Sequence, residues 1–279
     1  MTLSMKPLAD SIGVEVEDLD MSVPVGEEVA SALRAALSEH LLVVIRGQNL
    51  TSAQYLAAVD VFGTPMRQHM SSVLMDDHPE IAVLDSRKAP KRDDGTVNAV
   101  GSVIWHTDHT NHERPPATTC LYAVAMPTTG GGDTGFANMQ TAFEKLPPDE
   151  QAELMQLKTV NTFRNRRGFV TEDDLKKFDR ECIHPLIRTH PETGKKGIYV
   201  HWNQMDRLDG QESEPSRAFV KELIERTVTP DITYRHQWKV GDLVFIDNIG
   251  SMHKAMRDYQ HTETRVLHRI ILEGGVPYQ

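Results

Sequence analysis

The chain has 279 residues, of which 39% are hydrophobic and 25% charged, so it is long enough to bury a sizeable core. The formal net charge is −10, and lysine and arginine form no block beyond Arg164–Arg167, so we expect no nucleic-acid binding. No apolar run reaches the roughly 18–20 residues that span a bilayer, and Met1–Asp10 lacks the apolar core of a secretory signal. We therefore expect a cytoplasmic protein without a membrane partner.

The chain contains two cysteines, Cys120 and Cys182, which are far apart. In a chain without an export signal, such a sparse pair is more typical of reduced thiols than of a disulfide. Neither belongs to a Cys-x-x-Cys motif, so a structural zinc site is not expected.

Strand and helix patterns follow each other in the first quarter of the chain. Ile12–Leu19 alternates between apolar and polar residues and predicts a strand, whereas the apolar spacing of Val29–His40 predicts a helix. Leu41–Ile45 is a short continuous apolar run, which indicates a strand buried on both faces. Thr51 is a typical N-cap for a second helix over Ser52–Phe62.

The remaining chain contains more strands than helices. The expected strands are Ile81–Leu84, Thr118–Met126, Gly197–Trp202, Ile232–Trp238, Leu243–Ile246 and Arg265–Leu272. The expected helices are Thr141–Leu146, Pro148–Gln156 and Ser216–Thr227. The expected loops are the exposed Arg87–Val97, the turn Gly130–Gly132 and the charged segment Arg164–Arg180. No linker divides the chain, so residues 1–279 are expected to form one domain on a sheet or barrel, with helices outside.

A first candidate metal-binding pair lies in Trp105-His106-Thr107-Asp108. On an extended strand, residues two apart point to the same face, so His106 and Asp108 can grip one ion. They would supply two ligands of a 2-His-1-carboxylate site. The alternative is a surface strand with two polar residues facing water, and for so short a motif alone this alternative is favoured.

A second candidate ligand is His253, which follows the apolar strand ending at Asp247-Asn248. Asp and Asn favour turns, so His253 is expected near a strand end, where it can complete a site from another part of the sheet. The alternative is a loop histidine or one that is hydrogen-bonded in the core.

A third signal is the spacing of Arg265, Leu267 and Arg269, which share one face of the last expected strand. Arginine binds carboxylates through a planar fork, and two arginines facing a barrel interior would each need an anion. An exposed strand with its basic residues outward is the alternative, and both arrangements stay open from the pattern alone.

Together these segments resemble the family of taurine dioxygenase and dichlorophenoxyacetate dioxygenase, which are Fe(II)- and 2-oxoglutarate-dependent enzymes. The resemblance covers nearly the whole chain in the family's order. It includes Gly13–Val16, Val43–Gln48, Phe62–Pro65, Trp105–Asp108, Gly131–Thr134, His184–Gly194, Asp247–His253 and Arg265–Arg269.

The resemblance implies a mixed α/β, strand-rich fold with a double-stranded β-helix (jelly-roll) core and surrounding helices. It implies that His106, Asp108 and His253 bind Fe(II), and that Arg265 and Thr134 bind the distal carboxylate of 2-oxoglutarate. Arg269 matches the position that binds the anionic group of the substrate in taurine dioxygenase.

The implied activity couples oxidative decarboxylation of 2-oxoglutarate by O2, which yields succinate and CO2, to hydroxylation of a small anionic substrate. A sulfonate, an aryloxyalkanoate or an amino acid would fit, and hydroxylation beside a heteroatom can lead to C–S or C–O cleavage. Desaturation or ring formation in a biosynthetic pathway is an alternative outcome. The family also implies a homo-oligomer, either a dimer or a tetramer.

The expected substrate pocket departs from taurine dioxygenase. Ser102 replaces an asparagine four residues before the first ligand, and His109 replaces an apolar residue after the aspartate. His69 lies in the region of a substrate-contacting histidine, and Phe163 matches a pocket wall. For His109, a role behind the metal ligands or on the surface is as compatible with the sequence as substrate contact.

Two rival functions fit parts of the pattern. A non-enzymatic metal-binding jelly roll would not need the cosubstrate residues Arg265 and Thr134. A zinc hydrolase that used the same three ligands would leave Arg265 without a role.

Overall fold

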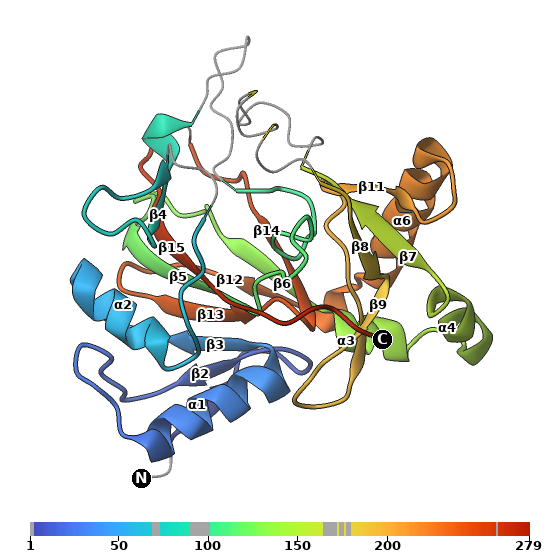
Figure 1. Cartoon of the computed structure of the whole chain (residues 1–279). Helices are drawn as coiled ribbons and strands as arrows, with labels where there is room; N and C mark the ends of the chain where they lie inside the picture. Colours follow the sequence, from blue (N-terminus) through green and yellow to red (C-terminus); the bar gives the residue numbers. More distant parts are fainter. Residues whose placement is uncertain are drawn as a thin grey trace.

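The computed structural model describes residues 3–68, 73–89, 101–163, 172, 176, 180–260 and 262–279. Its centre is a seven-stranded sheet in the order β1-β2-β3-β13-β5-β15-β4 (Figure 1). These strands are β1 (Met5–Pro7), β2 (Val14–Val16), β3 (Leu42–Ile45), β13 (Leu243–Asp247), β5 (Thr118–Ala125), β15 (Val266–Leu272) and β4 (Ala82–Asp85). All pairs in this sheet are antiparallel except β2 with β3.

A smaller sheet, β12-β6-β14, faces the large one. Its strands are β12 (Thr233–His236), β6 (Thr134–Asn138) and β14 (Ser251–Ala255). The apolar layer between the sheets contains Val44, Leu121 and Val244 from the large sheet and Phe136 from β6. Leu267 of β15 also belongs to this layer. Two facing antiparallel sheets around one apolar layer are the arrangement expected of a jelly roll.

Helices lie outside the sheets. They are α1 (Glu27–His40), α2 (Ser52–Asp60), α3 (Met139–Glu144), α4 (Pro148–Leu154) and α6 (Ser213–Thr227), with short 3-10 helices η2 (Ser86–Lys88) and η3 (Pro230–Ile232). Side chains of α1 and α2 form a second apolar cluster with the outer face of the large sheet. None of the described helices is long and apolar enough to cross a membrane.

A further set of short strands extends the fold beside α4 and α6 (Figure 1). They are β7 (Lys158–Asn161), β8 (Cys182–Pro185), β9 (Ile187–Thr189), β10 (Lys196–Ile198) and β11 (Met205–Leu208). They form the sheet β11-β7-β8 and the ribbon β10-β9. A third apolar cluster joins this region to α3, α4 and α6.

Most elements that the sequence predicts are present within a few residues, including α1, α2, α6 and strands β5, β12, β13 and β15. β3 is buried at every position, as its continuous apolar run predicts. Thr51 caps α2 and forms a capping box with Gln54. Cys120 and Cys182 are both free thiols, as expected.

Other predictions need correction. The strand expected over Ile12–Leu19 covers only Val14–Val16, and that expected over Gly197–Trp202 ends at Ile198. The strands β1, β6, β7, β8, β9, β11 and β14 were not predicted. They are short and lack clear alternation, so their pairing depends on neighbouring strands rather than on local pattern. Of the expected loops, residues 90–100 and most of 164–179 lie outside the described residues.

The helix α2 is anchored to the sheet through Tyr55, whose side chain is fully buried. Its hydroxyl lies 2.8 Å from the carbonyl oxygen of Cys120 and 3.3 Å from that of His268, so it can donate to β5 or to β15. This contact ties the helix to two neighbouring strands of the large sheet.

Tyr55→Phe should lower the free energy of unfolding by about 1–2 kcal/mol, because buried carbonyl groups lose a hydrogen-bond donor. Urea denaturation followed by circular dichroism measures this change. Tyr278→Phe is the matched control, since Tyr278 is 50% exposed and its loss should change little. Equal unfolding free energies for Tyr55→Phe and the wild type would contradict the anchoring role.

Candidate active site

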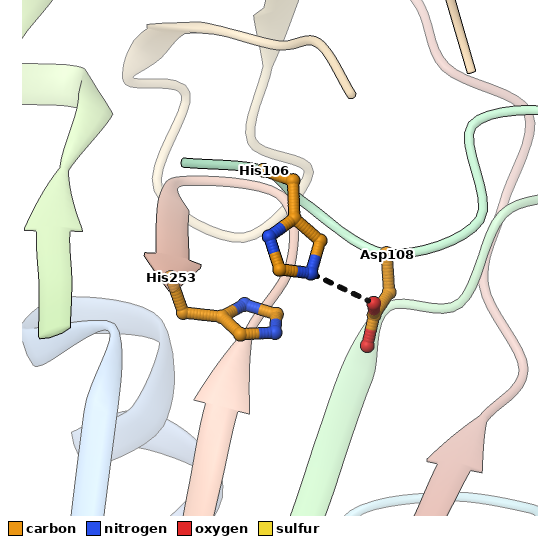
Figure 2. A group of neighbouring side chains, drawn as sticks. All are labelled: His106, Asp108 and His253. Carbon is orange, nitrogen blue, oxygen red and sulfur yellow. Dashed lines mark ion pairs between the residues drawn. The ribbon is translucent and has the colours of Figure 1, made fainter. Parts of the chain in front are cut away.

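Three side chains with metal-binding groups lie close together (Figure 2). One ligand atom from each of His106, Asp108 and His253 can be chosen so that all lie within 4.8 Å of one another. The Nε2 atom of His106 lies 3.6 Å from Oδ1 of Asp108. All three residues are buried.

Backbone pairing joins the first and last of these residues. The amide of His253 donates to the carbonyl oxygen of His106 at 2.8 Å, and the amide of His106 donates to that of His253 at 3.1 Å. The two imidazole rings lie with their centroids 4.3 Å apart. Residues 147 positions apart in sequence are thereby fixed in register.

The local structure differs from the expectation in two respects. Trp105–Asp108 is not a regular strand, because only His106 pairs there, as an isolated bridge to His201 and His253. His253 does not lie in a loop beyond a strand end but in the middle of β14, opposite Phe136 of β6. The turn after Asp247 is short enough that the chain enters a new strand at Ser251.

The environments of the three side chains suit a divalent cation. Nδ1 of His106 lies 2.8 Å from the carbonyl oxygen of Ile104 and so carries a proton, and Nε2 is the ring nitrogen that faces Asp108. Burial lowers the pKa of His253 to about 3, so its ring is neutral at pH 7. Burial would raise the pKa of Asp108, but the neighbouring positive charge of Arg269 helps to hold that pKa well below its ordinary value.

Two polar side chains behind Asp108 orient its carboxylate. The hydroxyl of Thr119 on β5 donates to Oδ2 of Asp108 at 2.7 Å. The side-chain amide of Asn248 donates to the Thr119 hydroxyl at 2.8 Å, and the Thr107 hydroxyl donates to the backbone carbonyl oxygen of Asn248 at 2.6 Å. Because Oδ2 is held in this way, Oδ1 is left facing His106.

Arg265 lies just before β15, and its side chain is buried. Its Nε donates to the carbonyl oxygen of Gly132 at 2.7 Å, and Nη2 lies 3.5 Å from Oγ1 of Thr134. Burial lowers the pKa of Arg265, but a guanidinium keeps its charge in proteins. Gly132 has φ +70°, and a Cβ there would lie 2.9 Å from Cδ of Arg265, so the loop must have glycine at this point.

Arg269 lies further along β15 and is partly buried. Its Nη2 donates to Oε1 of Gln68 at 2.8 Å, and its charge lowers the pKa of both Asp108 and His253. Among the residues that the structure describes, no carboxylate forms an ion pair with Arg269. Arg265 and Arg269 therefore both face inward, which resolves the alternative that the sequence left open.

The remaining predicted pocket residues have different surroundings. His109 is buried directly after Asp108, with φ 52°, and its ring centroid lies 5.4 Å from that of His112. Phe163 is buried after β7. The Ser102 hydroxyl is within hydrogen-bond distance of the backbone of Ile104. His69 lies outside the described residues.

The structure adds residues that the sequence analysis did not select. They are Thr119 and Asn248 behind Asp108, Gln68 beside Arg269, Gly132 beside Arg265, and His201, whose ring centroid lies 4.7 Å from that of His106. Asn248 and Gly132 lie in two of the segments that resemble the family, Asp247–His253 and Gly131–Thr134, but the sequence indicates no role for either residue. Nothing local marks Thr119 or Gln68, because their roles arise from contacts across the fold.

Two histidines and one aspartate have the composition of a 2-His-1-carboxylate site, which suits non-haem Fe(II) and leaves positions open for other ligands. The donor set and the jelly-roll core thus define the class of non-haem iron oxygenases. The model of the family described as taurine catabolism dioxygenase TauD, TfdA family, matches residues 4–271. The chain belongs to this family and is an Fe(II)- and 2-oxoglutarate-dependent dioxygenase.

Named relatives cover almost the whole chain. It is 31% identical to an alkylsulfatase of Acinetobacter baylyi, over 98% of this chain and 86% of the relative. It is 28% identical to the alpha-ketoglutarate-dependent 2,4-dichlorophenoxyacetate dioxygenase of Cupriavidus pinatubonensis, over 96% of this chain and 97% of the relative. The crystal structure of a taurine dioxygenase from Burkholderia xenovorans superposes on this chain with a TM-score of 0.81 and 31% sequence identity. The superposition covers 99% of this chain and 92% of that protein. The expected jelly-roll fold is confirmed.

Thr119→Val should weaken Fe(II) binding roughly tenfold, because the Asp108 carboxylate loses the hydroxyl that orients it. Anaerobic equilibrium dialysis with Fe(II) measures the dissociation constant. Thr118→Val is the matched control, since the side chain of Thr118 points to the other face of β5. Unchanged Fe(II) affinity in Thr119→Val would show that Asp108 needs no support from β5.

Proposed function

We propose that His106, Asp108 and His253 bind Fe(II) and that Arg265, with Thr134, binds the distal carboxylate of 2-oxoglutarate. The observation that supports this assignment best is the buried guanidinium of Arg265, which reaches Thr134 on the opposite sheet. A buried cation is costly without an anion, and its fork matches a carboxylate. A non-enzymatic metal site or a zinc hydrolase would give this arginine no role.

The bound iron and cosubstrate would supply the oxidising chemistry, in which 2-oxoglutarate and O2 yield succinate and CO2 while the substrate is oxidised. The residues of the chain position the reactants. Arg265 would hold the far carboxylate of the cosubstrate, so that its keto acid end could lie near the two histidines and Asp108. The apolar layer that contains Phe136 and Leu267 excludes water from the space between the sheets.

Addition of Fe(II) and 2-oxoglutarate together to the anaerobic protein should produce a weak visible charge-transfer band that neither produces alone. His253→Ala should abolish the band, because one metal ligand is lost. Arg265→Ala should raise the 2-oxoglutarate concentration for half-maximal band intensity by roughly tenfold or more, because the carboxylate loses a charged partner. Absence of the band in folded, iron-loaded wild type would refute the assignment.

We further propose that the substrate is a small anion and that Arg269 binds its charged group. The partner of Arg269 is the neutral amide of Gln68, so its charge stays available beside the metal ligands. The named relatives include an alkylsulfatase and a dichlorophenoxyacetate dioxygenase, which supports a sulfate ester, sulfonate or aryloxyalkanoate. Hydroxylation, with C–O or C–S cleavage where a heteroatom is adjacent, is the proposed outcome; desaturation or ring formation would show itself in the product.

Arg269→Gln should raise the KM for an anionic substrate by roughly tenfold to a hundredfold, because a charged hydrogen bond is lost. The KM for 2-oxoglutarate should change by less than about twofold, since Arg265 is retained. Succinate formation measures both constants. The uncharged methyl ester of the same substrate is the control and should be affected little. Equal increases in both KM values would place Arg269 outside the substrate site.

We also propose that residues 1–279 form a single dioxygenase domain and that the protein is a cytoplasmic homo-oligomer, either a dimer or a tetramer. The family match over residues 4–271 supports one domain. Light scattering after size-exclusion chromatography determines the oligomeric state.

A further inference from the structure

The hydroxyl of Thr134 receives two hydrogen-bond donors. Trp238 Nε1 lies 2.9 Å from Thr134 Oγ1, and Arg265 Nη2 lies 3.5 Å from the same atom. An indole N–H and a guanidinium can only donate, so both contacts use the oxygen of Thr134 as acceptor. The proton of the hydroxyl takes part in neither contact, and no acceptor for it is found in the described part of the chain.

We propose that Trp238 is a positioning residue for the cosubstrate, whose indole N–H turns the Thr134 hydroxyl so that its proton faces the anion held by Arg265. This inference rests on the proposed function, in which Arg265 and Thr134 bind a carboxylate. With both acceptor sites of its oxygen occupied, the Thr134 hydroxyl is a donor before the ligand arrives. A carboxylate accepts the hydroxyl proton and the guanidinium together and also balances the arginine's charge, whereas a cationic group would be repelled.

Trp238 is itself held in place from several sides. It lies two residues beyond His236, which pairs with Thr134 in the ladder between β12 and β6. The ring of His236 meets the Trp238 ring edge to face, with centroids 4.6 Å apart and an interplanar angle of 85°. Trp238 is buried, so its N–H needs a partner inside the protein, and Thr134 provides it.

A buried ionic network fixes His236 in turn. Its Nε2 lies 2.9 Å from Oδ2 of Asp242, which also accepts from Nη1 of Arg46 at 2.7 Å and from the amide of Lys239 at 2.9 Å. Arg46 Nε donates to Glu15 at 2.8 Å. The orientation of Trp238 is therefore supported by β12, by β2 and by the residue that follows β3, which come from distant parts of the chain.

The direct test is Trp238→Phe, which removes the N–H and keeps an aromatic ring. The dissociation constant of 2-oxoglutarate for the Fe(II)-loaded protein, measured by anaerobic calorimetry, should rise roughly three- to tenfold, the effect of one lost hydrogen bond. The Fe(II) dissociation constant should stay the same, because no metal ligand is touched. A general loss of structure would weaken both.

The matched control is Trp202→Phe. The indole of Trp202 also donates one hydrogen bond, to the carbonyl oxygen of Arg217 at 3.1 Å, and is partly buried. It belongs to the cluster around α6 rather than to the layer between the two facing sheets. We expect Trp202→Phe to bind 2-oxoglutarate like the wild type.

A double-mutant cycle tests whether Trp238 acts through Thr134. Thr134→Val should weaken 2-oxoglutarate binding, and adding Trp238→Phe to it should cause no further loss, because the oriented hydroxyl is already absent. Multiplication of the two separate effects would overturn the inference, since Trp238 would then act independently of Thr134.

Should Trp238→Phe fold poorly, replacing Trp238 by 3-benzothienylalanine keeps the bicyclic shape and exchanges only the N–H for sulfur. A raised 2-oxoglutarate dissociation constant in this protein supports the proposal, and a wild-type value overturns it. A wild-type value would overturn only the role of Trp238 and would leave the proposed function standing. If the wild type does not bind 2-oxoglutarate, or if Arg265→Ala binds it equally well, the carboxylate site itself is wrong.

Discussion

The site depends on the pair of backbone hydrogen bonds between His106 and His253. The segment that carries His106 and Asp108 belongs to no strand, and its other backbone contacts nearby are the bridge to His201 and the hydrogen bond from the Thr107 amide to Val200. The pairing fixes this segment against β14, whose position is set by its ladder with β6. Candidate metal-binding side chains from two remote parts of the chain are thus held close together by main-chain contacts.

Charge balance is the second constraint on the space between the sheets. An ionised Asp108 and two inward-facing arginines lie beside an apolar layer, where unpaired charges are costly. The protein limits this cost with fixed neutral partners: Thr119 for Asp108, the Gly132 carbonyl for Arg265, and Gln68 for Arg269. These partners orient the charged groups without neutralising them. The negative charge of Asp108 is therefore left for a cation, and the positive charges of Arg265 and Arg269 are left for anions.

The two facing sheets are coupled through polar contacts as well as apolar packing. Arg265 extends from the start of β15 to Thr134 on β6, and Trp238 contacts the same hydroxyl from beyond β12. The ionic network of Asp242, His236 and Arg46 stabilises that end of β12. The geometry proposed for the cosubstrate is therefore a property of both sheets, and it depends on residues that touch no ligand themselves.

The sequence predicted the strongly patterned elements, and its family resemblance pointed to the three residues that the structure brings together as a candidate metal site. Local patterns mark the buried strand β3 and the N-terminus of α2, and the structure contains both. The segments around His106 and His253 also lie together, as the family resemblance implied. Tertiary structure decided that His253 lies within a strand, that Arg265 and Arg269 face inward, and that Thr119, Gln68 and Trp238 support the site. The physical reason is that short strands and buried polar contacts gain their stability from partners distant in sequence, which no local periodicity records.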